Sequence, residues 1–443
     1  MNHAMRVTHV RVLHTETRFQ DVRLDRPFTI SGRPITHFTT AEVRVEVVTC
    51  AGARVQGRGT STLSVPWAWP SAPIDVDERD GALRSLVRQL AAAVTEAGPG
   101  DPIQIWHRLY ADLDRRLAEL AGDVGCPEVP RLAGLLALGA VDNAVHDAWG
   151  RAQTLPSYAM YTSEYLGECL GRFDPQLAGV YPGDYLGAAR HELPVQHVLG
   201  VGDPLAPHGA RSGVDSLSEW IARERLTHLK IKLAGDPVAD GRRVVSAFQV
   251  TREHGPVLAI SIDPNESYHS VADVHRMLDT VAELSEAAYR ALTYLEQPFP
   301  RGTNQDGESM RGLSDRVPTV MDEGFTRLSQ LDDLLEQGWS GVVIKAAKGQ
   351  SPAILAYGIA RARGMHVVAQ DLTAVCLGLE HSAALVAALE LSWPHLEYNS
   401  RQYAPGANAE LGARHPELVG VRDGMVTLPE GGTGLYPGRA CAG

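Results

Sequence analysis

The sequence predicts an α/β protein: a (β/α) barrel of seven or eight units, of the TIM type, preceded by an α+β capping module. Three observations support this prediction. Residues 5–65 alternate apolar and polar side chains, residues 79–155 carry apolar side chains at helical spacing, and from about residue 193 short apolar runs alternate with helical stretches. The length of 443 residues also favours one large and one smaller unit.

The capping module is expected over residues 1–155. The segments VTHVRVLHT and TTAEVRVEVVT have the period of two that strands show, and the glycine in AGA at 51–53 suits a hairpin turn. From about residue 79 the period changes to that of helices, in three stretches that end near a glycine or a polar break. Strands followed by helices indicate a compact α+β unit.

Residues 156–190 follow neither period and hold five tyrosines among several glycines. A segment of this length without regular structure is typically a lid, a contact surface or mobile. We therefore expect a lid-like insertion or linker here.

The barrel is expected over residues 191–400, where eight apolar runs alternate with helical stretches. The runs are LPVQHVLGV, THLKIKL, PVLAISID, LTYLEQP, PTVMDE, SGVVIKAA, MHVVAQD and PHLEYN. A doubly wound open sheet is the alternative, but no Gly-rich phosphate fingerprint follows the first run. The tail at 401–443, rich in Gly and Pro, is expected to return to the capping module.

Composition excludes several classes of protein. The net charge of −12 and the lack of a basic, aromatic stripe argue against a nucleic-acid partner. No apolar stretch is long enough to span a bilayer, and the first residues lack the apolar core of a signal peptide. Five scattered cysteines without CxxC spacing are typical of a reducing compartment, so a cytoplasmic location is expected.

Ionisable residues stand at the carboxyl ends of the predicted barrel strands, where an apolar run would be expected to continue. Following the chain, these strand-end residues are Lys230 and Lys232, Asp263 and Asn265, Glu296, Asp322 and Glu323, Lys345, Asp371, and Glu397. In a barrel these ends surround one mouth, the face on which catalytic residues lie. The spacings from Lys232 to Lys345 are 31, 33, 26 and 23 residues, each close to one βα unit.

This order has a chemical meaning. Three carboxylates on successive strands suit a hard divalent cation such as Mg²⁺, which prefers oxygen ligands. Lys230 and Lys232 are two apart on a strand and point to the same face, so each is expected to depress the pKa of the other toward that of a usable base. Any single carboxylate at a strand end could instead be a loop residue or a helix cap, and two lysines around one isoleucine could mark a surface strand. The ordered set is what favours a functional site.

At these positions the sequence resembles the enolase superfamily, specifically its muconate-lactonizing-enzyme-like branch in the mandelate racemase/muconate lactonizing enzyme family. The resemblance covers nearly the whole chain. It rests on LKIKLAG, IDPN, LEQPF and VIKAAKGQ, with MDEG in place of the Asp-Glu-Ser of the branch. The sequence departs from the family at Gly57-Arg58-Gly59-Thr60 and at the unusual VPWAWPSAP that follows, where Trp67 and Trp69 could shape the pocket or pack on the barrel rim.

The resemblance implies roles for these residues. It makes Asp263, Glu296 and Asp322 ligands of one Mg²⁺ ion, with Glu323 as the alternative third ligand or a neighbour of the ligands. It makes Lys232 the base on one face of the substrate, tuned by Lys230, and Lys345 the acid or base on the other face. Asn265, Asp371 and Glu397 are expected to support the site or contact the substrate. Dipeptide epimerases of this branch carry Asp-x-Asp where this chain has Glu397-Tyr398-Asn399, so that specific use is in doubt.

The reaction implied by the resemblance is removal of a proton next to a carboxylate, with a metal-stabilised enediolate as the intermediate. Two lysines on opposite faces favour a racemase, epimerase or cycloisomerase. A dehydratase (a lyase) acting on acid sugars would use the same half-reaction, and a barrel that binds a metabolite without catalysis is the alternative of another class. The expected partners are a small carboxylate substrate and further copies of the chain in a homo-oligomer. Substrate choice is expected to depend on capping loops at 16–35 and 57–70 and on the eighth strand.

Overall fold

The computed structural model describes residues 7–30, 33–207, 214–255, 259–303 and 307–438. An antiparallel sheet of three strands, β1 (Val10–Ile30), β2 (Arg33–Thr49) and β3 (Arg54–Leu63), forms the amino-terminal unit. Alternate residues of β2 from Ala41 to Val47 are buried, as a strand with one covered face requires. Its helices are α1 (Val65–Ala68), α2 (Val76–Ala93), α3 (Pro102–Ala111), α4 (Leu113–Asp123) and α5 (Arg131–Ala152).

The carboxyl-terminal unit is a curled parallel sheet with a helix after each strand, as predicted. Its parallel strands are β4 (Glu192–Leu199), β5 (His228–Lys232), β6 (Ala259–Asp263), β7 (Leu292–Glu296), β8 (Thr319–Met321), β9 (Gly341–Lys345), β10 (His366–Gln370) and β11 (Leu396–Glu397). They pair in the order β10-β9-β8-β7-β6-β5-β4-β11, so neighbours in the chain are mostly neighbours in the sheet. Each of the eight apolar runs of the sequence holds one of these strands, of which only β4 begins one residue before its run. This agreement confirms the barrel.

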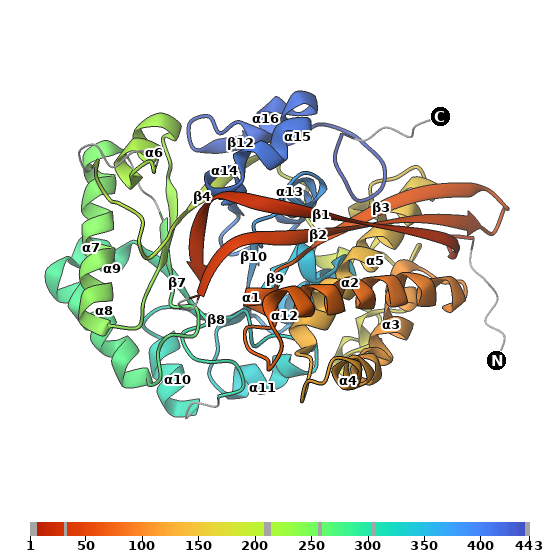
Figure 1. Cartoon of the computed structure of the whole chain (residues 1–443), viewed down its shortest axis with the longest axis horizontal. Coiled ribbons are helices and arrows are strands. Elements are labelled where there is room, and N and C mark those ends of the chain that lie inside the picture. Colours follow the sequence, from red (N-terminus) through yellow and green to blue (C-terminus); the bar gives the residue numbers. More distant parts are fainter. Residues whose placement is uncertain (1–6, 31–32, 208–213, 256–258, 304–306, 439–443) are drawn as a thin grey trace.

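Helices surround the sheet (Figure 1). They are α6 (Leu217–Glu224), α7 (Pro237–His254), α8 (Val271–Leu284), α9 (Glu286–Arg290), α10 (Gly307–Ser314), α11 (Gln330–Glu336), α12 (Gln350–Ala362), α13 (Leu377–Ala388), α14 (Ser400–Tyr403), α15 (Ala409–Arg414) and α16 (Pro416–Val419). The last strand, β12 (Met425–Thr427), pairs antiparallel with β4. Within the described ranges, no helix is long and apolar enough to cross a membrane.

The prediction of a capping loop at residues 16–35 is wrong. Strand β1 continues to Ile30 and β2 begins at Arg33, so residues 16–30 and 33–35 belong to the outer half of one long hairpin, and residues 31–32 lie outside the described ranges. Figure 1 shows this hairpin crossing from the helices of the amino-terminal unit to the barrel. Its outer half is held there by Arg26, which pairs with Asp203 after β4 at 2.6 Å and lies over the ring of Tyr403. These long-range contacts stabilise strands whose own sequence, rich in charged residues, looks like a loop.

Residues 156–190 form short 3-10 turns rather than helices or strands. Tyr161 is fully buried and its hydroxyl contacts His146 of α5, while the Tyr158 hydroxyl donates to Gln350 at the start of α12. The segment thus packs along α5 and α12. The chain near its end contacts the same region, because the amide of Leu435 donates to Asp147 of α5.

Glycines in β3 let helix α5 approach the sheet closely. A Cβ atom on Gly59 would lie 2.2 Å from the backbone nitrogen of Ala144, and one on Gly57 would lie 2.3 Å from that of Ala148. Both glycines therefore face small residues four apart on one side of the helix. This contact joins the strand that leads to Trp67 with the helix that precedes the barrel.

We expect Gly59→Ala to lower the free energy of unfolding by about 3 kcal/mol, because the backbone of α5 must move to admit the methyl group. Gly81→Ala is the matched control: Gly81 is exposed in helix α2 with nothing within 4 Å of its added Cβ, so the variant should gain about 1 kcal/mol. Urea unfolding of both variants checks this. If both variants changed the free energy of unfolding by the same amount in the same direction, the close contact between β3 and α5 would be contradicted.

Candidate active site

A cavity lies at the carboxyl ends of the barrel strands. Its floor holds the predicted residues Lys230, Lys232, Glu296, Asp322 and Lys345. Its roof comes from the amino-terminal unit, namely Phe28, Thr29, Ile35, Phe38, Thr62, Ser64 and Trp67. The two segments expected to influence substrate choice, 16–35 and 57–70, therefore do line the cavity. The prediction that 57–70 is a loop is wrong, because this segment consists mainly of the end of strand β3 and helix α1.

Lys230 is the centre of the floor. Its side chain is 1% exposed, and its Nζ lies 2.8 Å from Glu296, 3.1 Å from Asp263 and 3.1 Å from Glu397. Burial alone would lower the pKa of Lys230, but the carboxylates of Glu296, Glu397 and Asp263 outweigh it and raise that pKa well above its usual value. The predicted depression of the Lys230 pKa is therefore wrong, since three anions face it and only one ammonium stands two residues away.

Lys232 is the more open of the two lysines on β5. Its side chain is 13% exposed, and its Nζ contacts Asp263 Oδ2 at 2.5 Å. Asp263 is also held by the amide of Asn265, which donates to Oδ1 at 2.8 Å. Burial acts to raise the pKa of Asp263, but Lys232 and Lys230 outweigh burial and hold that pKa below its usual range. Asp263 is thus an ionised acceptor at the end of β6.

Lys345 occupies the other side of the carboxylates, at the end of β9. Its Nζ lies 3.0 Å from Asp322 Oδ2 and donates to Oε1 of Gln370 at 3.0 Å. Burial acts to lower the pKa of Lys345, but Asp322 outweighs it and raises that pKa above its usual value. Because β5 and β9 lie on either side of β6, β7 and β8 in the sheet, Lys232 and Lys345 flank the three predicted ligands.

A further lysine, Lys348, belongs to the site and was not predicted. Its Nζ donates to Asp322 Oδ1 at 3.1 Å and to the backbone oxygens of Asp322 and Phe325. Burial lowers the pKa of Lys348. A simple signal in the sequence could have found it: the chain has 41 lysines and arginines, and only Lys230, Lys232, Lys345 and Lys348 are lysines. Arginine carries the positive charge everywhere else, so every primary ammonium side chain lies at this site.

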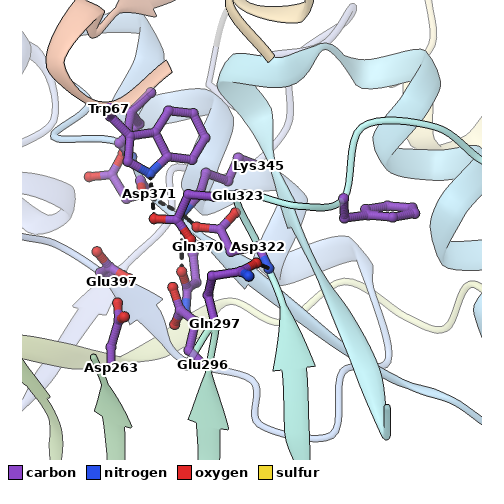
Figure 2. Close-up of polar contacts among 12 residues, drawn as sticks. Trp67, Asp263, Glu296, Gln297, Asp322, Glu323, Lys345, Gln370, Asp371 and Glu397 are labelled. Carbon is purple, nitrogen blue, oxygen red and sulfur yellow. Dashed lines mark hydrogen bonds and ion pairs between the residues drawn. The ribbon is translucent and has the colours of Figure 1, made fainter. Parts of the chain in front are cut away.

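Glu323 faces the capping side (Figure 2). The indole Nε1 of Trp67 donates to Glu323 Oε1 at 2.9 Å, and Asn265 donates to the same oxygen at 3.3 Å. The ring of Trp67 also lies 5.5 Å from the Nζ of Lys345. Burial raises the pKa of Glu323 to about 7, and the charge of Asp322 adds to the rise. Of the two roles that the sequence left open for Trp67, shaping the pocket or packing on the barrel rim, the structure thus shows the first.

The remaining predicted residues line or support the cavity. Asp371 accepts from the amides of Leu372 and Ala374, which fixes the turn after β10. Burial raises its pKa to about 7, and the charge of Glu397 adds to the rise. No role was predicted for Gln370. Its Oε1 accepts hydrogen bonds from both Lys230 and Lys345, so it links the two lysines across the cavity floor.

The composition of the floor suits a divalent cation. Six carboxylates (Asp263, Glu296, Asp322, Glu323, Asp371, Glu397) meet four lysine ammonium groups, a formal balance of −2. Burial raises the pKa of Glu296 to about 8, and the charge of Asp263 adds to the rise. Oε2 of Glu323 is buried and has no hydrogen-bond partner among the described residues. Uncompensated buried negative charge of this kind is what a bound cation would neutralise.

The ammonium groups separate the carboxylates. In the part of the chain that the structure describes, no three His, Cys, Asp or Glu side chains are arranged to hold a metal ion. Lys230 bonds to both Asp263 and Glu296, while Lys345 and Lys348 bind Asp322. The donor set fits a hard cation by its chemistry, and the ligand assignment remains a prediction.

Removing the central ammonium should destabilise the protein. We expect Lys230→Met to lower the free energy of unfolding by about 3–5 kcal/mol, because three buried carboxylates lose their shared partner. Added Mg²⁺ should restore part of this loss by binding the folded state. Urea unfolding with and without Mg²⁺ measures both effects. Arg290→Met, which breaks an exposed ion pair with Glu286, is the control and should change stability little.

Comparison with known proteins assigns the chain to a family. Residues 214–437, just over half of the chain, match the family model described as "Enolase C-terminal domain-like". This protein belongs to the enolase superfamily. Among curated proteins, this superfamily member is 23% identical to muconate cycloisomerase 1 of Rhodococcus opacus over 440 residues, covering 96% of this chain and 95% of the relative.

Solved structures of the superfamily share the fold along nearly the whole chain. A dipeptide epimerase from Enterococcus faecalis, complexed with Mg and the dipeptide L-Leu-L-Tyr, superimposes with a TM-score of 0.63 at 15% identity, covering 96% of this chain and 99% of that one. A muconate lactonizing enzyme from Pseudomonas fluorescens, complexed with muconolactone, gives 0.61 at 17% identity and 96% of both chains. The barrel with its capping domain is therefore the fold of enolase-superfamily enzymes.

Proposed function

We propose that this enolase-superfamily member is an isomerase that uses a divalent cation, with Mg²⁺ as the expected ion. It removes the proton on the carbon next to a carboxylate and returns a proton to the resulting anion. The reaction is a racemisation, epimerisation or cycloisomerisation of a small carboxylic acid. The relatives named above, an epimerase and cycloisomerases, support this class of reaction.

One observation carries the proposal: Lys232 and Lys345 line one cavity on either side of the strands that bear Asp263, Glu296 and Asp322. A carbon acid beside a carboxylate is weak, so the reaction needs both a base near the carbon and positive charge near the carboxylate oxygens. A bound divalent cation would neutralise charge that develops on the substrate carboxylate. Asp263, Glu296 and Asp322 would hold that cation, with Glu323 as an alternative to Asp322.

In this proposal each of the four lysines has a different role. Lys232 is the more exposed and takes the proton from the substrate, while Lys230 keeps Asp263 and Glu296 in place. Lys345 holds an ammonium on the opposite side, where it donates a proton or stabilises the anion. Lys348 fixes Asp322 through two hydrogen bonds, donates a third to the backbone oxygen of Phe325, and does not reach the substrate in this role. Trp67 closes the capping side of the cavity and keeps water from the reacting carbon.

Proton exchange tests the function directly. The protein is incubated in D₂O with a library of carboxylic acids, with and without Mg²⁺, and the products are followed by ¹H NMR and polarimetry. Incorporation of α-deuterium with inversion supports a racemase or epimerase, and incorporation with ring opening or closure supports a cycloisomerase. A 2-keto acid product would move the assignment to a dehydratase. Absence of exchange with every carboxylate, with or without Mg²⁺, would contradict the proposal.

A further inference from the structure

The turn after the sixth barrel strand is held by side chains of the amino-terminal unit. This β9–α12 turn, Ala346–Lys348, connects strand β9 with helix α12. Asn143 of α5 donates to the backbone oxygen of Ala346 at 3.1 Å, and Ser61 of β3 donates to that of Ala347 at 2.8 Å. Asn143 is 0% exposed and Ser61 is 2% exposed. Because a buried carbonyl oxygen needs a donor, these two side chains fix the path of the turn.

Asn143 binds two further segments at the same time. Its Nδ2 also donates to the backbone oxygen of Thr60 in β3 at 2.9 Å, and its Oδ1 accepts from the amide of Gln350 in α12 at 2.8 Å. Its neighbour Asp142 accepts from the amide and the hydroxyl of Ser351, the next residue of α12. An asparagine side chain supplies the two donors and the acceptor that the three backbone groups need. Asn143 thus joins β3, the turn and α12.

Helix α5 reaches the turn because a glycine faces it. A Cβ atom on Gly139, one helical turn before Asn143, would lie 2.4 Å from the backbone oxygen of Ala347 and 3.0 Å from the amide nitrogen of Gly349. The helix and the β9–α12 turn are therefore closely packed, so a displacement of one requires a displacement of the other.

The β9–α12 turn carries part of the active site. Lys348 is its last residue, and the Nζ of Lys348 donates to Oδ1 and to the backbone oxygen of Asp322. Lys345 directly precedes the turn, and its Nζ lies 3.0 Å from Oδ2 of the same carboxylate. The two lysines therefore hold both oxygens of an expected metal ligand. A displacement of the turn would move Lys348 first, and Asp322 and Lys345 with it.

We propose that Asn143 and Ser61 are positioning residues of the active site. They hold the β9–α12 turn in the place from which Lys345 and Lys348 fix Asp322 for the reaction. The side chains of Asn143 and Ser61 are not among those that line the cavity, so they act through the turn and not on the substrate. The amino-terminal unit thus aligns one side of the floor in addition to forming the roof. This inference rests on the proposed function, because it assumes that Lys345 and Asp322 take part in the reaction.

The Nζ resonances of the four lysines report the geometry of the floor without a substrate. The full-length protein is labelled with ¹⁵N-lysine, and each resonance is assigned by substitution of that lysine by arginine. Spectra of Asn143→Ala and of the natural protein are then compared without Mg²⁺. Since the turn loses a hydrogen bond to α5, we expect the Lys348 resonance to shift most and the Lys345 resonance to shift less. Lys230 and Lys232 lie on β5, so their resonances should stay in place.

Asp147→Ala is the matched control. Asp147 lies one helical turn after Asn143 on α5, is 2% exposed, and accepts from the amides of Arg58 in β3 and Leu435 near the chain end. Its substitution removes a buried contact between α5 and β3 farther along the helix. All four lysine resonances should therefore stay in place in this control.

Ser61→Ala provides a second and smaller perturbation. It removes only the hydroxyl that donates to Ala347, so the Lys348 resonance should shift less than in Asn143→Ala. This variant decides the question if Asn143→Ala does not fold. With a substrate identified by proton exchange, Asn143→Ala should also exchange about 10²-fold more slowly, which is the effect of a displacement of about 1 Å.

Three results would overturn the inference. These are a Lys348 resonance that stays in place in either folded variant, equal shifts of all four resonances, or the same shifts in Asp147→Ala. The spectra require no substrate. Failure of the proposed function would be seen as absence of proton exchange in the natural protein, so it is distinguishable from each of these results.

Discussion

Lys232→Ala is expected to lower the rate of α-proton exchange by about 10³-fold, within the range that general bases contribute. The reason is that the Lys232 side chain lines the cavity and is 13% exposed, whereas the Lys230 side chain is 1% exposed and its Nζ is bound to three carboxylates. Exchange of a carboxylate substrate in D₂O, followed by ¹H NMR with Mg²⁺ present, measures the effect.

Lys232→Arg is the matched control for charge. It keeps a cation beside Asp263, but a guanidinium does not lose its proton in proteins and cannot act as a base. We therefore expect Lys232→Arg to be as inactive as the alanine variant, with stability close to that of the natural protein. Exchange at a normal rate in the arginine variant would show that Lys232 acts only through its charge.

Glu296→Gln is expected to weaken Mg²⁺ binding by at least about 100-fold and to abolish exchange. Groups that merely support metal ligands contribute 10- to 100-fold to affinity, so loss of a ligand should reach or exceed that range. The substitution keeps the size of the side chain and removes its charge. Isothermal titration with Mg²⁺, without substrate, gives a result that does not depend on activity.

Glu283→Gln is the control for this variant, because Glu283 lies exposed on helix α8 and loses the same charge far from the cavity. Its Mg²⁺ affinity should equal that of the natural protein. If Glu296→Gln bound Mg²⁺ as tightly as the control, Glu296 would not be a ligand. The same titration of Asp263→Asn and Asp322→Asn would then show which carboxylates bind the metal.

The barrel could be predicted because its signals are local. In a run such as SGVVIKAA the residues before the lysine are apolar on both faces, and the strand Gly341–Lys345, which ends at that lysine, follows from those residues alone. The regular spacing of charged residues at strand ends then placed Lys232, Asp263, Glu296, Asp322 and Lys345 at one mouth.

The hairpin and the supporting contacts could not be predicted in this way. Val22 of the outer hairpin is buried against residues such as Val375 and Ala404, which lie more than 350 residues away in the sequence. Three carboxylates from three other strands raise the pKa of Lys230. The prediction considered only the neighbouring ammonium of Lys232 and therefore had the wrong direction for the shift. Long-range contacts decide both features.

The four lysines allow the central claim to be measured directly. With ¹⁵N-labelled lysine the protein should show four Nζ resonances, which substitution of each lysine by arginine assigns to Lys230, Lys232, Lys345 and Lys348. If one cation lies among Asp263, Glu296 and Asp322, one equivalent of paramagnetic Mn²⁺ should broaden all four signals, and excess Mg²⁺ should restore them. Four signals unchanged by Mn²⁺ would contradict the shared cation site on which the proposed chemistry depends.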